Sequence, residues 1–394
     1  MSARIDVELR EIMALGSGSV NPERFPDEVF DLYSIPAFDR GTPEVVAGKD
    51  IGSTKQVVEP GDVLLSKIVP HIRRTWVVGP HRGRRIIASG EWIVFRGERI
   101  HPGYVRHVLV GDPFHAQFMR TVTGVGGSLL RARPAHVAKI AIPLPSHQDQ
   151  RRIADILDRA DALRAKRRAA IALLDTLTQS IFLEMFGDAA TNDRGWLSSL
   201  TLGEVADVAS GVTKGRKLSG AAATRRVPYL AVSNVQDMRL DLTVVKTIDA
   251  SDAEIVRFRL ERGDLLLTEG GDPDKLGRGT LWHGGLTDCI HQNHVFRVRV
   301  TNHSVEPVFL NWLVSSNRGK RYFLRSAKQT TGIASINMTQ LRGFPLLLPP
   351  IELQQEFTRR VAAVDKLKAA HRASLAQLDA LFASLQHRAF RGEL

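Results

Sequence analysis

An internal duplication constrains this chain more than any other feature of its sequence. IPLPSHQDQRRIADIL, which begins at Ile142, is matched by LLLPPIELQQEFTRRV, which begins at Leu346. The spacing of matching segments is 193 residues for LREIMALGSG and LGEVADVASG, 202 for GDVLLSK and GDLLLTE, and 205 for Pro145 and Pro350. Offsets that rise slowly along the chain indicate a tandem duplication with small loop insertions. The repeat is far longer than solenoid units of roughly 20 to 50 residues, so it predicts two whole domains.

Each repeat predicts a mixed α+β domain that leads into a long helix. Short apolar or alternating runs such as DVLLSKI, WIVFRG, VFRVRV and PLLLP are separated by Gly, Pro, Asn and Asp, which is typical of strands and turns with a few short helices. The expected parts are a first globular domain at 1–145, a first long spacer helix at 146–190, a second globular domain at 191–350 and a second long spacer helix at 351–394.

Both long helices carry a narrow apolar seam with spacings of three and four, which suits packing against another helix. A helix of about 40 residues is roughly 60 Å long, whereas a domain of some 150 residues has a radius of gyration of about 15 Å. We therefore expect the two helices to pair as an antiparallel coiled coil with a pseudo-two-fold relation, rather than each packing only on its own domain. The predicted pairing residues are Ile153, Ile156, Leu163, Leu174, Leu177 and Ile181 in the first helix, and Phe357, Val364, Leu367, Leu378, Phe382 and Leu385 in the second.

The charge of the chain points to a polyanionic partner. A formal net charge of +12 and a pI near 10.1 suit nucleic acid or an anionic membrane surface. Nucleic acid is favoured, because apolar runs such as FPLLLPPI are much shorter than the roughly 20 residues that span a bilayer. The start of the sequence, MSARIDVELREIM, shows no secretory signal, and we expect a cytoplasmic protein without membrane contact.

Basic residues gather in tracts without acids in both repeats, and one more loop, TEGGDPDKLGRGT, adds two further candidates. Guanidinium groups bond bidentately to phosphate and to the O6/N7 edge of guanine, so these tracts predict DNA contacts. A basic tract can also be an ordinary solvated face. The candidate DNA-binding residues are Lys67, Arg73, Arg74, Arg82, Arg84, Arg85 and Arg131 in the first repeat, and Lys214, Arg216, Lys217, Arg225, Arg226, Lys275, Arg278, Lys320, Arg321 and Lys328 in the second.

The two repeats differ in charge at one corresponding loop. The first has the acid-free SKIVPHIRRT, whereas the second has TEGGDPDKLGRGT with Glu269, Asp272 and Asp274. Carboxylates accept hydrogen bonds from cytosine N4. If both loops contact DNA, we therefore expect them to read different sequences.

The sequence lacks the motifs of DNA-modifying and ATP-driven enzymes. It has no G-x-x-x-x-G-K-[ST], no N-P-P-[YF] tetrapeptide and no glycine-rich cofactor loop after a strand. GDPDKLG resembles a metal-nuclease motif only faintly, and WHGGLTDCIHQNHVF, with Cys289 and His291, has no established metal-ligand spacing. A single cysteine also excludes an internal disulfide framework. We therefore predict no catalytic residue, no metal site and no cofactor in this chain.

Four paired features, taken together, resemble the specificity subunits of type I restriction-modification enzymes. They are the openings LREIMALGSG and LGEVADVASG, the GD[VL]LL pair, the apolar-proline-glutamine junctions and the long helix after each junction. The family has Glu-Gln at the junction, and the matching pairs here are taken to be Asp149-Gln150 and Gln354-Gln355. The resemblance covers nearly the whole chain.

The resemblance implies two target recognition domains, each reading one half of a split site in double-stranded DNA. The paired helices would separate them and dock two modification (methyltransferase) subunits. S-adenosylmethionine, ATP and Mg would then belong to partner subunits, including restriction and translocase subunits where the system is complete. Two alternatives remain at this point: a self-contained DNA methyltransferase or nuclease with diverged motifs, and a helical scaffold protein with incidental basic faces.

Overall fold

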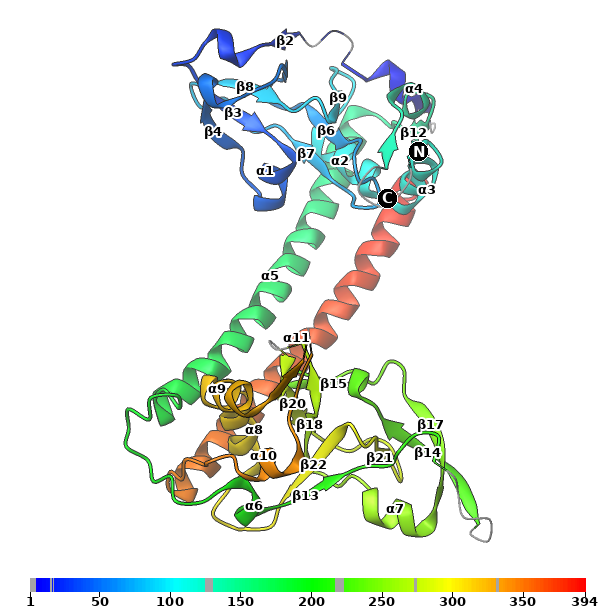
Figure 1. Ribbon diagram of the computed structural model, residues 1–394. Helices are drawn as coiled ribbons and strands as arrows, with labels where there is room; N and C mark the ends of the chain where they lie inside the picture. Colours follow the sequence, from blue (N-terminus) through cyan, green and yellow to red (C-terminus); the bar gives the residue numbers. More distant parts are fainter. Residues whose placement is uncertain are drawn as a thin grey trace. The chain divides into compact units, whose positions relative to one another are not determined.

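The two GD[VL]LL segments form central strands of matching antiparallel sheets. The computed structural model describes residues 5–14, 16, 18–124, 130–216, 223–272, 275–330 and 333–394. The chain divides into unit 1, residues 1–170 and 371–394, and unit 2, residues 171–370. The helices α5 (His147–Phe186) and α11 (Ile351–Phe390) each run from one unit into the other, so each unit holds one globular part and a segment of each helix (Figure 1).

Unit 1 is built around the three-stranded sheet β7-β6-β9 and the five-stranded sheet β2-β5-β8-β3-β4. The first sheet contains β6 (Val63–Ser66), β7 (Thr75–Val77) and β9 (Trp92–Phe95). The second contains β2 (Ser19–Val20), β3 (Val29–Tyr33), β4 (Glu44–Ala47), β5 (Lys55–Val57) and β8 (Arg85–Ala88). Two small ladders join β1 (Asp6–Glu8) to β12 (Ala141–Pro143) and β10 (Val122–Thr123) to β11 (Arg131–Ala132). The helices are α1 (Ile35–Arg40), α2 (Pro102–Val110), α3 (Asp112–Met119) and α4 (Pro134–Val137).

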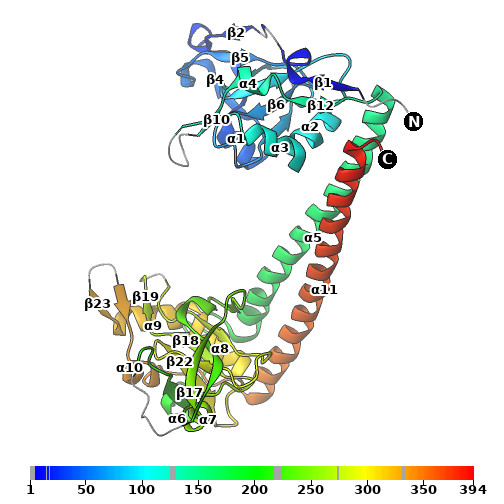
Figure 2. The ribbon, with the colours of Figure 1, turned by 90° about the vertical axis from the view of Figure 1, so that its right-hand side faces the viewer.

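Unit 2 has a central strand of the same length in a four-stranded sheet. Its main sheet, β13-β22-β18-β20, contains β13 (Ala206–Ser210), β18 (Leu265–Thr268), β20 (Gly279–Leu281) and β22 (Val295–Val300). A second sheet contains β14 (Thr224–Leu230), β17 (Lys246–Ser251) and β21 (Ile290–His291). A third sheet contains β19 (Gly270–Gly271), β23 (Lys328–Thr330) and β24 (Ile333–Ser335). A two-stranded ladder joins β15 (Val235–Gln236) to β16 (Arg239–Leu240). The helices are α6 (Leu202–Val205), α7 (Asp252–Phe258), α8 (Pro307–Ser315), α9 (Asn317–Ser326) and α10 (Met338–Arg342). Figure 2 shows α8 and α9 beside β18 in this unit.

The turn before each central strand explains the repeated GD pair. Gly61 and Gly263 have φ values of 90° and 95°, a left-handed region that glycine adopts without steric cost. The Asp62 carboxylate accepts from the Glu59 amide at 2.8 Å and bonds Arg96 at 2.7 and 2.6 Å. Unit 2 repeats these bonds with an Asp264 carboxylate that accepts from the Glu261 amide and from Arg299.

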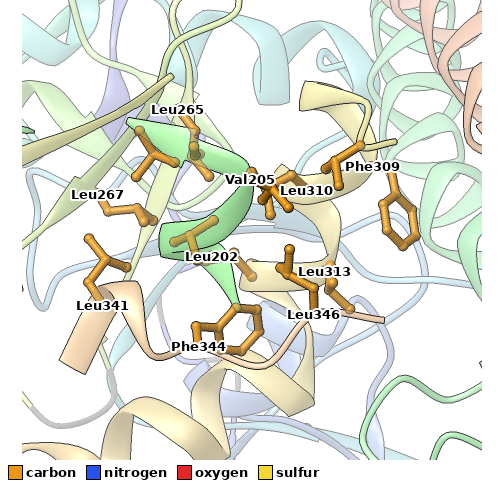
Figure 3. Close-up of a cluster of buried hydrophobic side chains, with 14 of the residues drawn as sticks. Leu202, Val205, Leu265, Leu267, Phe309, Leu310, Leu313, Leu341, Phe344 and Leu346 are labelled. Atoms are coloured by element: carbon orange, nitrogen blue, oxygen red, sulfur yellow. The ribbon is translucent and has the colours of Figure 1, made fainter. Parts of the chain in front are cut away.

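The central strands are continuous apolar runs because both of their faces are buried. In unit 2, Leu265 and Leu267 point into a cluster with Leu202 of α6 and Leu310 of α8, and Phe344 closes it (Figure 3). The residue between them in the strand, Leu266, packs on the other face with Trp282. Burying one such leucine contributes roughly 1.5 to 3 kcal/mol, so these strands anchor the fold.

The structure confirms the α+β class and shows α5 and α11 packed together. In unit 1, the Arg164 guanidinium bonds Asp379 at 2.6 Å and Arg167 lies 3.1 Å from His371. In unit 2, Lys368 pairs with Asp175 at 3.0 Å. Residue numbers rise along one helix as they fall along the other, so the pairing is antiparallel within each unit.

The seam of this helix pair is more polar than the sequence predicts. Leu163, Leu177 and Leu367 are 51%, 43% and 52% exposed, so these three predicted pairing residues face solvent. Apolar packing is concentrated near the helix ends, where Ile153 and Phe382 are buried in unit 1 and Phe357 is buried in unit 2. The other predicted pairing residues, Ile156, Leu174, Ile181, Val364, Leu378 and Leu385, are buried or half-buried. Polar groups inside a helix seam favour one register at some cost in stability.

One stretch of α5 is apolar enough, over 18 residues with a mean hydropathy of 1.4, to cross a membrane by length and composition. Two of its apolar residues, Phe182 and Phe186, lie in the core of unit 2. Asp175 of the same helix is paired with Lys368. These contacts are those of a helix packed within a protein.

Candidate nucleic-acid interface

The predicted basic residues of unit 1 fall into three places, and the first is the carboxyl end of β6. Lys67 follows this strand directly, and its carbonyl accepts from the Ala132 amide of β11 at 2.7 Å. Arg131 lies beside it because Ile68 and Arg131 form an antiparallel bridge. The Arg131 guanidinium is 60% exposed and 3.3 Å from Glu91. The structure thus brings together two predicted residues that are far apart in the sequence.

The second place is the segment before β7, where two adjacent arginines have opposite surroundings. Arg74 is buried, and its Nε and Nη2 bond both carboxylate oxygens of Asp39 at 2.9 and 3.0 Å. The Arg74 guanidinium holds the pKa of the Asp39 carboxyl below its usual range. Arg73 is exposed, donates to the Val110 carbonyl and pairs with Asp112. Arg74 therefore has a structural environment, whereas Arg73 remains accessible.

The third place is the GPHRGRR segment that leads into β8. Arg84 donates to the buried Asp31 carboxylate at 2.7 Å. Arg85 pairs with Glu28 at 3.0 Å and stacks 4.8 Å from the centre of the Phe25 ring. Arg82 is exposed and has no acidic partner among the described residues. Among Arg82, Arg84 and Arg85, only Arg82 is exposed without an acidic partner among the described residues.

Unit 2 shows the same neutralisation of its first basic tract. The Arg216 guanidinium bonds both carboxylate oxygens of Glu254, at 2.6 and 2.8 Å. Hydrogen bonding from Arg216 lowers the pKa of Glu254 to about 2. Arg225 pairs with Asp252 and Asp288, and Arg226 donates to the Thr247 hydroxyl. Lys214 is exposed, and Lys217 lies outside the described residues.

The second basic region of unit 2 is a hollow of about 290 Å³ beside the junction of α8 and α9. Lys275, Arg278 and Lys320 contribute to its lining, together with Asp237 and the Ser315 hydroxyl. Lys275 pairs with Asp272 at 2.5 Å. The three predicted cations that the sequence scatters over residues 275–320 are therefore neighbours in space.

The exposed face of α9 extends this basic region. Arg321 lies on it, while Phe323 of the same helix is buried in the core. Lys328 continues the region into β23 and is also exposed. Arg325, which the predicted set leaves out, lies four residues beyond Arg321 and is exposed as well, so helical spacing was the signal that could have found it.

The junction before each long helix is held by a buried glutamine. The side-chain oxygen of Gln150, Oε1, accepts from the His101 main-chain amide at 2.8 Å. The side-chain nitrogen of Gln150, Nε2, donates to the Pro145 main-chain carbonyl at 2.9 Å. In unit 2 it is Gln354 that accepts from the Glu306 amide at 3.0 Å and donates to the Pro349 carbonyl at 2.8 Å. The alignment of the two repeats in the sequence pairs Gln150 with Gln355 and Pro145 with Pro350, and it is wrong by one residue. The matching residues in the structure are Gln354 and Pro349.

Within the described residues, no group of three or more His, Cys, Asp or Glu side chains is arranged to hold a metal ion. His291 is fully buried with its Nδ1 2.7 Å from the Val295 carbonyl, and His294 pairs instead with Glu269. Burial raises the pKa of the Cys289 thiol to about 12, which suppresses the nucleophilic thiolate. The described residues thus form two related α+β units that carry exposed basic side chains and contribute to one pair of long helices.

Comparison with known proteins identifies the group to which this architecture corresponds. No protein-family model matches the chain. The specificity subunit of the type I restriction enzyme StySPI from Salmonella potsdam is 24% identical over 374 residues, which cover 90% of this chain and 79% of that subunit. The EcoKI specificity subunit of Escherichia coli is 24% identical over 320 residues, covering 76% of this chain and 68% of that one.

Solved structures share the fold over the whole length. A chain from a structure of the assembly and conformational transition of the type I restriction-modification system has a TM-score of 0.58 and 20% identity, covering 99% of this chain and 98% of that one. The S subunit of a type I system from M. genitalium has a TM-score of 0.57 and 12% identity, covering 99% and 96%. The chain is similar over most of its length to the specificity subunits of type I restriction enzymes, which confirms the resemblance that the paired sequence features predict.

Proposed function

We propose that this chain is the DNA-specificity subunit of a type I restriction-modification enzyme and that each unit recognises one half of a bipartite site. The observation that carries this proposal is a pair of units with the same hydrogen-bonded frame but different exposed charges. The frame includes the Asp62–Arg96 and Asp264–Arg299 pairs. The charges differ at matching positions, because Lys67 follows the central strand in unit 1 and Glu269 follows it in unit 2. A duplicated fold with diverged surfaces suits reading two different DNA sequences.

In this proposal, phosphate contacts supply most of the affinity and base contacts supply the specificity. The accessible cations suit phosphate contact, because no acidic partner neutralises them among the described residues. They include Arg82 in unit 1, and Lys214, Lys320, Arg321 and Lys328 in unit 2. The paired residues Arg74, Arg84 and Arg216 contribute to these surfaces by holding loops in place.

We further propose that α5 and α11 dock two modification subunits. Exposed leucines on these helices support this step, because solvated helix faces seldom carry so many large apolar side chains. They are Leu163, Leu173, Leu177 and Leu183 on α5, and Leu367 and Leu381 on α11. Methyl transfer from S-adenosylmethionine, and any ATP- and Mg-dependent cleavage, would then belong to the partner subunits.

The test is methylome sequencing of a methylation-free host that expresses the modification subunit with and without this chain. We expect one bipartite motif that appears only when both are present. Methylation or cleavage by the purified chain alone would support a self-contained enzyme. Salt-dependent binding without any sequence preference in the complete complex would support a scaffold protein. Native mass spectrometry should show two modification subunits for each copy of this chain.

A further inference from the structure

The residues that follow the two central strands, Lys67 and Glu269, occupy equivalent positions in the main-chain frame. The Lys67 amide donates to the Glu91 carbonyl at 3.0 Å, and its carbonyl accepts from the Ala132 amide at 2.7 Å. The Glu269 amide donates to the His294 carbonyl at 3.0 Å, and its carbonyl accepts from the Ile336 amide at 2.9 Å. The residue at the strand end therefore makes the same two main-chain hydrogen bonds in both units.

The pairing of neighbouring strands extends this equivalence to two more positions. Arg131 lies opposite Ile68 in unit 1, as Ser335 lies opposite Gly270 in unit 2. Across the hairpin, Arg131 faces Thr123 and Ser335 faces Lys328. We call the four matched positions the strand-end quartet, which is Lys67, Glu91, Thr123 and Arg131 in unit 1 and Glu269, His294, Lys328 and Ser335 in unit 2.

Every position of the strand-end quartet differs in charge between the units, although the main-chain bonds and strand pairings correspond. Lysine is matched by glutamate, glutamate by histidine, threonine by lysine and arginine by serine. The start of the same strand behaves in the opposite way, because Asp62 with Arg96 and Asp264 with Arg299 keep both their identities and their bonds. The bonded frame at the start of the strand is thus retained in both copies, whereas the charges at the strand-end quartet are not.

The quartet side chains are placed to meet a ligand. The side chains of Glu91 and Glu269 are 29% and 33% exposed, and those of their partners Arg131 and His294 are 60% and 56% exposed. Each unit thus presents two partly exposed side chains that hold each other by one contact, Arg131 with Glu91 in unit 1 and His294 with Glu269 in unit 2. Groups of this kind can exchange water for a base edge with little loss of side-chain entropy.

We propose that the strand-end quartets are the base-reading positions of the two units. Lys67 and Arg131 present donors suited to the O6 and N7 acceptors of guanine. The Glu269 carboxylate, held by His294 Nδ1 at 2.5 Å, presents an acceptor suited to the N4 amino group of cytosine. This inference rests on the proposed function, and it assigns opposite hydrogen-bonding demands to the two half-sites.

The experiment uses the complex of the full chain with its modification subunits on a library in which each half-site is randomised. Glu269→Gln should reduce discrimination at one base pair of one half-site by roughly 10- to 100-fold and leave the other half-site unchanged. Lys67→Gln should have the mirror-image effect. Glu261→Gln is the matched control, since Glu261 belongs to the retained frame at the start of the strand, and it should leave both half-sites as they are.

The outcomes separate this inference from the proposed function. An unchanged motif in active complexes of both Glu269→Gln and Lys67→Gln overturns the inference, while the proposed function stands. Loss of preference at both half-sites by either variant overturns it too. A wild-type complex that methylates without any motif overturns the proposed function itself. If Glu269→Gln fails to assemble, Lys67→Gln decides the question on the other half-site.

Discussion

Gln150 and Gln354 hold the same place in the two units, each fully buried with its amide bonded to the proline carbonyl five residues earlier. Each also accepts from the main-chain amide just before the matching helix, α2 in unit 1 and α8 in unit 2. One side chain thereby ties the start of a long helix to the globular part of its unit. The equivalence also sets the true repeat offset at this junction, one residue shorter than the sequence comparison has it.

Gln354→Leu should lower the free energy of unfolding of unit 2 by about 1 to 3 kcal/mol, because it leaves buried main-chain groups without partners. Gln355→Leu is the matched control, since Gln355 is exposed. Urea unfolding followed by intrinsic fluorescence measures both. Equal losses for the two variants would contradict the one-residue assignment of the junction.

The stability of unit 2 should fall in mild acid because of His291. Burial lowers the pKa of His291 to about 4, from an ordinary value of 6.5. The unfolded state therefore binds the extra proton first, and stability is lost as the pH falls from about 6.5 towards 4. The slope should approach roughly 1.4 kcal/mol per pH unit, or about tenfold per unit in the opening equilibrium.

Cys289 offers a direct reading of this opening, because it is the single cysteine of the chain and is buried in the same unit. The rate at which a pyridyl disulfide labels Cys289 is divided by the rate for the chain unfolded in urea at the same pH, which removes the pH dependence of the thiol's own reactivity. This corrected rate should increase as the pH is lowered below 6.5. His291→Gln should flatten the profile, and His283→Gln, at an exposed position, should not. A corrected rate that does not change with pH in the native chain would show that His291 is not the responsible group.

The polar seam of the helix pair should be energetically coupled across the two helices. The Arg164 guanidinium bonds Asp379 at 2.6 Å and Asp161 at 2.9 Å, and it lies 4.3 Å from the centre of the Phe382 ring. A double-mutant cycle with Arg164→Ala and Asp379→Ala should give a coupling of about 1 kcal/mol. Asp365→Ala, which removes an exposed carboxylate with only a long contact to Lys368, should cost less than about 0.5 kcal/mol. If the losses in free energy of unfolding from Arg164→Ala and Asp379→Ala simply add in the double variant, the two residues are not coupled across the helices.

The basic face of α9 should act on DNA without regard to sequence. Arg321→Ala should weaken cognate and scrambled DNA alike and reduce the slope of log affinity against log salt by about 0.9 for each phosphate contact removed. Arg262→Ala is the control, because Arg262 is exposed in the turn at the opposite end of β18. Filter binding at several salt concentrations measures both, and a loss confined to cognate DNA would assign Arg321 to base reading instead.

Local patterns in the sequence determined the duplication, the α+β class, the buried GD[VL]LL strands and the two long helices. Such patterns are readable because periodicity and turn chemistry act over a few residues. The extent of the basic tracts could also be read, and so could the difference between SKIVPHIRRT and TEGGDPDKLGRGT.

Only the tertiary structure decided which cations are neutralised and which residues meet. Arg74 reaches Asp39 and Arg216 reaches Glu254 across more than 30 residues of sequence, so a tract without acids in the sequence is not without acids in space. The exposed Leu163 shows the same limit in the helix seam, because an ideal helix drifts by about 20° per heptad and small errors of phase move a residue off the seam. Charge pairing and packing depend on distances through space, and those are set when distant segments come together.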